Sequence, residues 1–234
     1  MNNSTILIIP TYKESKNIYL LLTEILNLNI KLDILIIDDN SDDGTQEIVN
    51  KLSLVYPQIS MLVRPRKLGL GSAYREAYKI ALLKEYQYFI QMDADFSHQL
   101  TDLIKMYEIR KNFDLIIGSR YVQDGGTKGW SKKRLFLSKF ANNFVKFRTK
   151  VNINDSTSGF RVYSRYALSK INFLSTNSEG YGFQIEMTYM ARESSLDIIE
   201  VPITFIERNA GNSKMSKKII LEAFNLVLKL KKLK

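Results

Sequence analysis

Two aspartates separated by a single residue, Asp93 and Asp95, directly follow the apolar residues 88–92. Such a run is typical of a buried strand, and open α/β sheets build their ligand sites at strand ends. Carboxylates are hard oxygen ligands that favour Mg²⁺ or Mn²⁺ over zinc, and a magnesium site usually completes its coordination with substrate phosphates and water. The pair therefore suggests a nucleotide diphosphate ligand, although carboxylates at this spacing also cap loops.

The residues around the pair predict the sheet that must position it. We expect strands over residues 5–9, 33–37, 59–63, 88–92 and 114–117, separated by segments with apolar residues at helical spacing. This alternation predicts a parallel sheet with right-handed crossovers and helices on both faces. The strands are followed by PTYKE, DDNS, RPR, DAD and GSR. Because the carboxyl ends of parallel strands share one edge, these polar groups are expected to converge on one site.

The second strand is followed by a turn rich in acids, DDNSDDGT at residues 38–45. Asp42, Asp43 or Thr45 can cap the helix that begins there. Asp38 and Asp39 sit at the strand tip, where they could either organise the turn or accept hydrogen bonds from a base and a ribose. Both interpretations stay open on the sequence.

Gly69 and Gly71 precede the third predicted helix. A dinucleotide-binding loop would have a third glycine and would follow the first strand, so the two glycines indicate close helix packing or approach of the backbone to a ligand. Further along, residues 125–129 contain three glycines and predict a mobile loop. The single histidine, His98, is expected to be structural or to support the site indirectly.

The composition limits the class of protein. The 234 residues are 45% hydrophobic and contain no cysteine, so the chain can bury a core without disulfides or thiolate metal sites. Of the net charge of +10, residues 128–150 contribute +8 and residues 214–234 contribute +6, which leaves the rest mildly acidic. Such clusters suit a polyanionic surface. A nucleic-acid binder would leave the acidic strand ends unexplained and lacks an aromatic stacking motif, so no nucleic acid is expected.

In chain order, the motifs resemble the family-2 glycosyltransferases with the GT-A fold, a Rossmann-like, mostly parallel sheet flanked by helices. They are IIPTYKESKNI, IIDDNSDDGT, RPRKLGLGSAYREA, MDADFSH, GSRYVQDGGTKGW, DSTSGFRVYSR, GYGFQIEM and EVPITFIERNAGNSK. The likeness covers residues 4–216 and is greatest for the dolichol-phosphate or polyprenol-phosphate mannosyltransferase branch. The Gln-x-x-Arg-Trp signature of processive polysaccharide synthases is absent, and a nucleotidyltransferase would have a glycine-rich loop after the first strand.

The resemblance implies roles for matching positions. The expected donor-nucleotide residues are Pro10, Tyr12, Glu14, Ile37, Asp39, Asp93, Ala94, Asp95, Arg120, Arg208 and Lys214. The metal ligands implied are Asp93 and Asp95, with Ser97 where some relatives have glutamine. The acceptor phosphate is expected at Arg120, Arg134 and Ser138, and the catalytic set is Asp93, Asp95 and Arg120.

The implied reaction transfers mannose from GDP-mannose to dolichyl or polyprenyl phosphate with inversion, using Mg²⁺ or Mn²⁺. A phosphate acceptor is already ionised near neutral pH, so no strong general base is needed. The alternative is a family-2 enzyme that uses another donor, such as UDP-glucose, on polyprenyl phosphate or on a glycan.

The expected lipid acceptor raises the question of membrane contact. No apolar stretch approaches the ~20 residues that span a bilayer. We expect a GT-A catalytic domain over residues 1–213 and a basic amphipathic helical tail over 214–234, which could lie on a membrane or pack on the core. Residues 132–150 form a second basic amphipathic stretch. The expected location is cytoplasmic, peripheral on the cytoplasmic face of a membrane, held by these stretches or by a separate membrane subunit.

Overall fold

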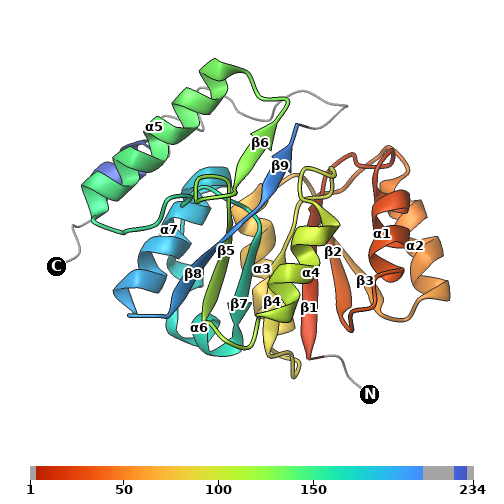
Figure 1. Cartoon of the computed structure of the whole chain (residues 1–234). Helices are drawn as coiled ribbons and strands as arrows, with labels where there is room; N and C mark the ends of the chain where they lie inside the picture. The colour runs from red at the N-terminus through yellow and green to blue at the C-terminus, as the bar shows by residue number, and fades with distance from the viewer. Residues whose placement is uncertain (1–3, 208–223, 231–234) are drawn as a thin grey trace.

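The computed structural model describes residues 4–207 and 224–230, and the central feature is a seven-stranded sheet (Figure 1). Its strands lie in the order β3-β2-β1-β4-β7-β5-β8. Their bounds are β1 Thr5–Thr11, β2 Asp33–Asp38, β3 Ile59–Val63, β4 Tyr88–Gln91, β5 Leu115–Ser119, β7 Arg161–Ser164 and β8 Ile198–Pro202. The five strands predicted from apolar runs are all present, so the mostly parallel sheet is confirmed.

One strand departs from the predicted parallel pattern. β7 lies between β4 and β5 and is antiparallel to both, whereas β1, β2, β3 and β4 pair in parallel, as do β5 and β8. Its sequence, RVYS, is too short for a clear period-2 pattern. An antiparallel strand at this place means that its amino end, not its carboxyl end, reaches the functional edge of the sheet.

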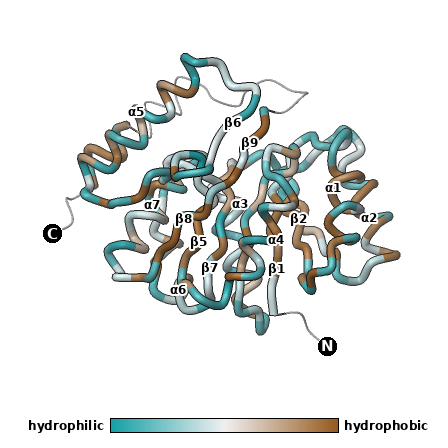
Figure 2. The backbone as a smooth tube through the Cα atoms, viewed as in Figure 1, coloured by the Kyte–Doolittle hydropathy of each residue, from teal (hydrophilic) through white to brown (hydrophobic). Residues whose placement is uncertain are grey.

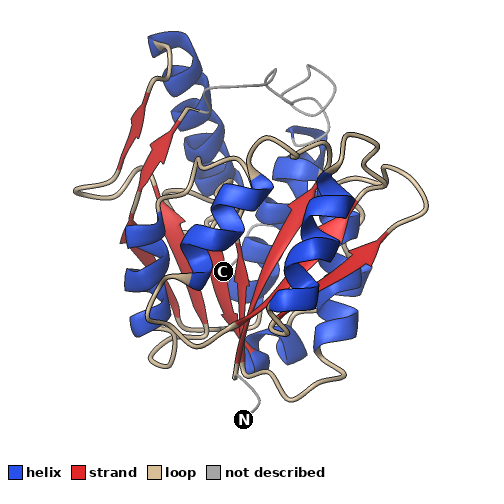
Figure 3. Cartoon of the chain, turned by 90° about the vertical axis from the view of Figure 1, so that its right-hand side faces the viewer, coloured by secondary structure: helices blue, strands red, loops and turns tan. Residues whose placement is uncertain are grey.

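Helices cover both faces of the sheet, as Figure 3 shows from the side. Helices α1 Ile18–Leu26, α2 Thr45–Val55 and α4 Leu100–Glu108 pack on one face, and α3 Leu70–Ala81, α6 Arg165–Lys170 and α7 Gly180–Glu193 on the other. Alternate residues of β1 feed the two cores: Ile6 and Ile8 join the α3 side, and Leu7 and Ile9 join the α1 side. Because both faces are buried, the strand reads as a continuous apolar run.

A small second sheet rises above the functional edge. Strands β6 Gly126–Lys128 and β9 Thr204–Ile206 pair in parallel, so the predicted loop at residues 125–129 contains a strand. The backbone N–H of Ile206 donates to the carbonyl of Ser97 at 3.0 Å, which joins this sheet to the turn after β4. Helix α5, Lys132–Thr149, follows β6 and stands apart from the main sheet in Figure 1.

Most of the predicted tail, residues 214–223 and 231–234, lies outside the described residues. Residues 224–229 are helical. In this part, Val227 is buried against Val145 of α5 and Ile185 of α7, and the Phe224 ring stacks on Phe144 with centroids 4.8 Å apart. A basic amphipathic helix over the whole tail, and the domain division at residue 213, stay predictions. Within the described part of the chain, no helix combines the length and apolar character needed to cross a bilayer.

Candidate active site

A cavity of ≈ 350 Å³ opens at the carboxyl ends of β1, β2 and β4, and we call it the polar cavity because many carboxylate, hydroxyl and amide side chains line it. Of the predicted donor and metal residues, those that line it are Pro10, Tyr12, Glu14, Asp39, Asp93, Ala94, Asp95 and Ser97. Ile37 is fully buried in the core on the α3 side and does not line it. Arg208 and Lys214 lie outside the described residues. The convergence of separate strand ends, expected from topology, therefore holds for most of the predicted residues.

The turn after β4 directs both aspartates of the pair to this cavity. The Asp93 N–H donates to His98 Nδ1 at 3.2 Å, the Ser97 N–H donates to Asp95 Oδ1 at 3.1 Å, and Phe96 adopts a left-handed φ of 59°. The Asp93 side chain is 35% exposed. The pair is thus held at the cavity rather than turned into the protein.

The donor set fits a divalent cation that shares its coordination with a substrate. Asp93 and Asp95 supply hard carboxylate oxygens, and Ser97 lies in the same wall. Among the described residues, no group of three or more His, Cys, Asp or Glu side chains could hold a metal. Since Mg²⁺ and Mn²⁺ commonly complete their coordination with phosphate and water, two carboxylates suffice for such a site.

His98 lies in the protein interior next to this turn and accepts a hydrogen bond from its backbone. Its imidazole is 2% exposed and stacks on Phe160 with ring centroids 4.6 Å apart. Burial lowers the pKa of His98, against the opposite effect of Asp93 and Asp95. A neutral imidazole that accepts the Asp93 N–H agrees with the structural role expected from the sequence.

The turn after β2 divides its acids between structure and site. Asp38 is fully buried and accepts from the Thr11 and Ser41 hydroxyls at 2.7 Å, so it organises the turn and is not exposed to a ligand. Asp39 lines the cavity, but its Oδ1 lies 2.6 Å from Arg64 Nη1. Its Oδ2 accepts the N–H groups of residues 68 and 69 at 3.2 Å each. Asp39 therefore holds the glycine loop as part of the cavity wall.

The two glycines of this loop serve close packing. Gly69 has φ +101°, and a Cβ there would lie 2.5 Å from a carboxylate oxygen of Glu179. A Cβ on Gly71 would lie 2.5 Å from the carbonyl oxygen of Ser178. The packing interpretation of these glycines is thus confirmed, and the partner is the segment that precedes α7.

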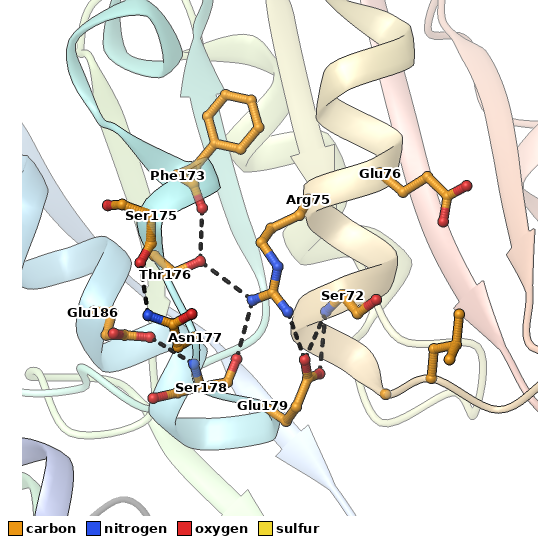
Figure 4. A network of polar contacts seen from close by, with 12 residues as sticks. Ser72, Arg75, Glu76, Phe173, Ser175, Thr176, Asn177, Ser178, Glu179 and Glu186 are labelled. Atoms are coloured by element: carbon orange, nitrogen blue, oxygen red, sulfur yellow. Dashed lines mark hydrogen bonds and ion pairs between the residues drawn. The ribbon is translucent and has the colours of Figure 1, made fainter.

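That segment is fixed to α3 by a polar network (Figure 4). The Glu179 carboxylate lies 2.6 Å from Arg75 Nη2 and accepts the Ser72 N–H with both oxygens at 3.1 Å. Arg75 also donates to Thr176 Oγ1 and to the Ser178 carbonyl, each at 3.2 Å. Since the N-cap residue of α3 makes no side-chain cap hydrogen bond, Glu179 caps this helix from the segment that precedes α7. No local sequence pattern predicts this pair, whose members are 104 residues apart.

A second, mainly apolar cavity of ≈ 250 Å³ lies between α5, α7 and residues 224–230. All three residues predicted to hold the acceptor phosphate line it: Arg120, Arg134 and Ser138. The remaining wall is largely apolar and aromatic: Trp130, Leu137, Phe140, Ala141, Phe144, Val145, Ile185, Phe224 and Val227. The predicted acceptor residues are therefore brought together, away from the turn after β2.

Arg120 lines this second cavity and not the first, so its predicted contact with the donor has no support in the cavity walls. Its guanidinium forms a two-point ion pair with Asp155, with distances of 2.7 and 2.6 Å. Burial disfavours both charges, but the mutual attraction raises the pKa of Arg120 and lowers that of Asp155. Asp155 was missed as a site residue, although it begins the quoted motif DSTSGFR.

Arg134 joins the two cavities. It lines both of them, as do Thr157 and Tyr181. Its guanidinium pairs with Glu207 and lies 3.9 Å from the centroid of the Trp130 ring. A polar cavity and an apolar cavity with cationic residues thus share one wall.

Comparisons with known proteins agree with this geometry. The family model described as glycosyl transferase family 2 matches residues 6–171. A polyprenol monophosphomannose synthase of Mycolicibacterium smegmatis is 40% identical over 221 residues, which are 94% of this chain and 83% of that protein. An undecaprenyl-phosphate mannosyltransferase of Micrococcus luteus is 37% identical over 216 residues, covering 92% and 89%.

Solved structures share the fold. A mannosyltransferase of Pyrobaculum calidifontis in complex with GDP-Man and Mn²⁺ matches with TM-score 0.60 and 15% identity over 91% of this chain and 59% of that chain. A glucosyl-3-phosphoglycerate synthase of Mycobacterium tuberculosis with Mn²⁺, UDP and phosphoglyceric acid matches with TM-score 0.67 and 14% identity, covering 96% and 78%. The chain therefore belongs to glycosyl transferase family 2, and it is a glycosyltransferase with the GT-A fold.

Proposed function

We propose that this enzyme transfers mannose from GDP-mannose to a polyprenyl or dolichyl phosphate and inverts the anomeric configuration. The two curated relatives, at 40% and 37% identity, are named for mannosyl transfer to lipid phosphates. The observation that carries the proposal is the pair of adjoining cavities with a common wall of Arg134, Thr157 and Tyr181. A hydrophilic donor and a lipid acceptor need adjacent sites, one with charged and polar side chains and one that is mainly apolar.

The polar cavity suits the sugar nucleotide. Tyr12, Glu14 and Asp39 lie at the β1 and β2 edge, where we place the guanosine, and Asp93 and Asp95 lie at the β4 edge, where we place the diphosphate. A divalent cation held by these carboxylates supplies positive charge that stabilises the departing GDP. Arg208 and Lys214 are proposed to contact the donor phosphates.

The acceptor phosphate is proposed to bind at Arg120, Arg134 and Ser138, which all line the apolar cavity. Arginine suits this task because its planar group binds phosphate oxygens at two points. In the reaction, an acceptor phosphate oxygen forms a bond to the anomeric carbon while the bond from that carbon to the diphosphate oxygen breaks. The electron pair of the broken bond leaves with GDP, and attack from the opposite side gives the β-linked product.

Helix α5 is proposed to lie against a membrane surface. Its exposed apolar side chains include Phe136, Phe140 and Phe147, at 69, 60 and 77% exposure, and no acid occurs in residues 128–150. Figure 2 shows hydrophobic and hydrophilic residues alternating along this helix. Basic amphipathic helices with exposed aromatics bind anionic lipid interfaces. We expect the enzyme to co-sediment with vesicles that contain anionic lipid, and replacement of the three phenylalanines by serine to abolish this. Unchanged binding of the variant would assign attachment to the tail, and a wild type that does not bind would assign it to a separate membrane subunit.

Incubation with labelled donor and lipid phosphate tests the function directly. GDP-mannose with polyprenyl phosphate and Mn²⁺ should yield a mild-acid-labile lipid-linked mannose. GDP-glucose and UDP-glucose, compared in the same assay, test the alternative donors. Faster transfer from UDP-glucose would replace the proposed donor, and transfer only to a soluble glycan would replace the proposed acceptor.

A further inference from the structure

A buried amide in the wall of the polar cavity has no hydrogen-bond partner among the described residues. Gln184 lies in the first half of α7 and lines the cavity, and its residue is 1% exposed. Among the residues that the structure describes, neither its Nε2 nor its Oε1 has a hydrogen-bond partner. Buried side-chain amides are nearly always hydrogen-bonded, because an unpaired donor or acceptor loses its water without compensation.

The neighbours of Gln184 show which part of the cavity it faces. A Cβ on Gly159 would lie 3.7 Å from Asp93 Oδ1 and 4.0 Å from Gln184 Nε2. The carboxylate and the amide therefore border the same small space, which exists because residue 159 has no side chain. This space lies in the polar cavity, whose wall also contains Thr157 and Tyr181, the residues shared with the apolar cavity.

The space beside Gly159 corresponds to the transferred sugar of the proposed donor. The nucleotide end of the cavity is formed by the turns after β1 and β2, and the carboxylate pair marks the diphosphate. The transferred sugar must lie between the diphosphate and the acceptor, and Asp93, Gly159 and Gln184 line the cavity that shares Thr157 and Tyr181 with the apolar cavity. A primary amide both donates and accepts, and a sugar hydroxyl does the same.

We propose that Gln184 binds a hydroxyl of the transferred sugar and thereby determines donor sugar specificity. The inference rests on the proposed function for the identity of the sugar. A site built to hydrogen-bond one hydroxyl rejects the analogue that lacks it, because the amide is then left buried and unpaired.

The test replaces Gln184 with methionine, which has a similar shape and no amide. Because the native amide loses no partner within residues 4–207 and 224–230, Gln184→Met should keep or raise the melting temperature. The kcat/KM for GDP-mannose should fall on the order of 100-fold or more. Affinity for GDP, which lacks the transferred sugar, should match that of the wild type. Gln91→Met is the control, since Gln91 is equally buried but lines neither cavity.

Donors that lack one mannose hydroxyl identify the contact. The wild type should discriminate strongly against one deoxy analogue, and Gln184→Met should process that analogue and GDP-mannose at similar rates. An equal loss for every analogue, a parallel loss of GDP affinity, or the same loss of selectivity in Gln91→Met would overturn the inference. If the wild type uses another sugar nucleotide instead, the proposed function fails, and the same comparison with deoxy forms of that donor still tests Gln184.

Discussion

The Arg75–Glu179 pair provides a quantitative test of how the donor cavity is held together. Glu179→Ala removes the ion pair with Arg75 and leaves the Ser72 N–H at the start of α3 without its acceptor. The two charged side chains are 18% and 33% exposed, so water weakens their attraction. We therefore take about 1.5 kcal/mol for the charged contact and about 1 kcal/mol for the unpaired N–H, at the low end of the range for such groups.

The expected loss is about 2.5 kcal/mol in the free energy of unfolding, or a fall in melting temperature of about 5–10 °C for a chain of this size. Glu179→Gln keeps an acceptor for the Ser72 N–H and should lose about half as much. Urea unfolding followed by circular dichroism measures both variants. Because Glu179 lines the donor cavity, the KM for the sugar nucleotide should rise in both variants while the KM for the lipid acceptor changes less.

A double-mutant cycle with Arg75→Met isolates the charged contact, and we expect a coupling free energy of about 1.5 kcal/mol. Asp42→Asn is the matched control, because the Lys13–Asp42 pair has a similar distance of 2.8 Å but lies on the exposed surface, and it should change stability little. A coupling within about 0.3 kcal/mol of zero, or an equal effect in the control, would refute the structural role assigned to this pair.

Two further variants test the site, and a third tests how the stability of the fold depends on pH. Asp95→Asn should abolish transfer and weaken Mn²⁺ binding in a calorimetric titration; retained metal-dependent turnover would contradict its assignment. Arg134→Ala should raise the KM for the lipid acceptor more than that for the donor, and the reverse pattern would move this residue to the donor side. Burial acts to raise the pKa of Asp43, but hydrogen bonds from Thr45 and Ser15 lower it from 3.8 to about 2. This carboxylate therefore stabilises the fold above its usual pKa and loses the effect as the pH falls toward 2, so the destabilisation by Asp43→Asn should be largest near neutral pH and shrink on acidification.

The sequence by itself determined the parallel part of the sheet and the main site. Continuous apolar runs identify strands that are buried on both faces, and parallel strands bring their carboxyl ends to one edge. This topology is enough to place Asp39, Asp93 and Asp95 in one cavity. The order and spacing of the motifs then identified the family.

Only the tertiary structure decided which polar groups pair across long sequence distances. The antiparallel β7, inserted between β4 and β5, brings the segment of Asp155 to Arg120, and α7 brings Glu179 to Arg75 and Gln184 to the cavity. None of these residues belongs to a local pattern that distinguishes a buried polar side chain from an exposed one. The partner of such a group depends on which element packs beside it, and local periodicity contains no information about that.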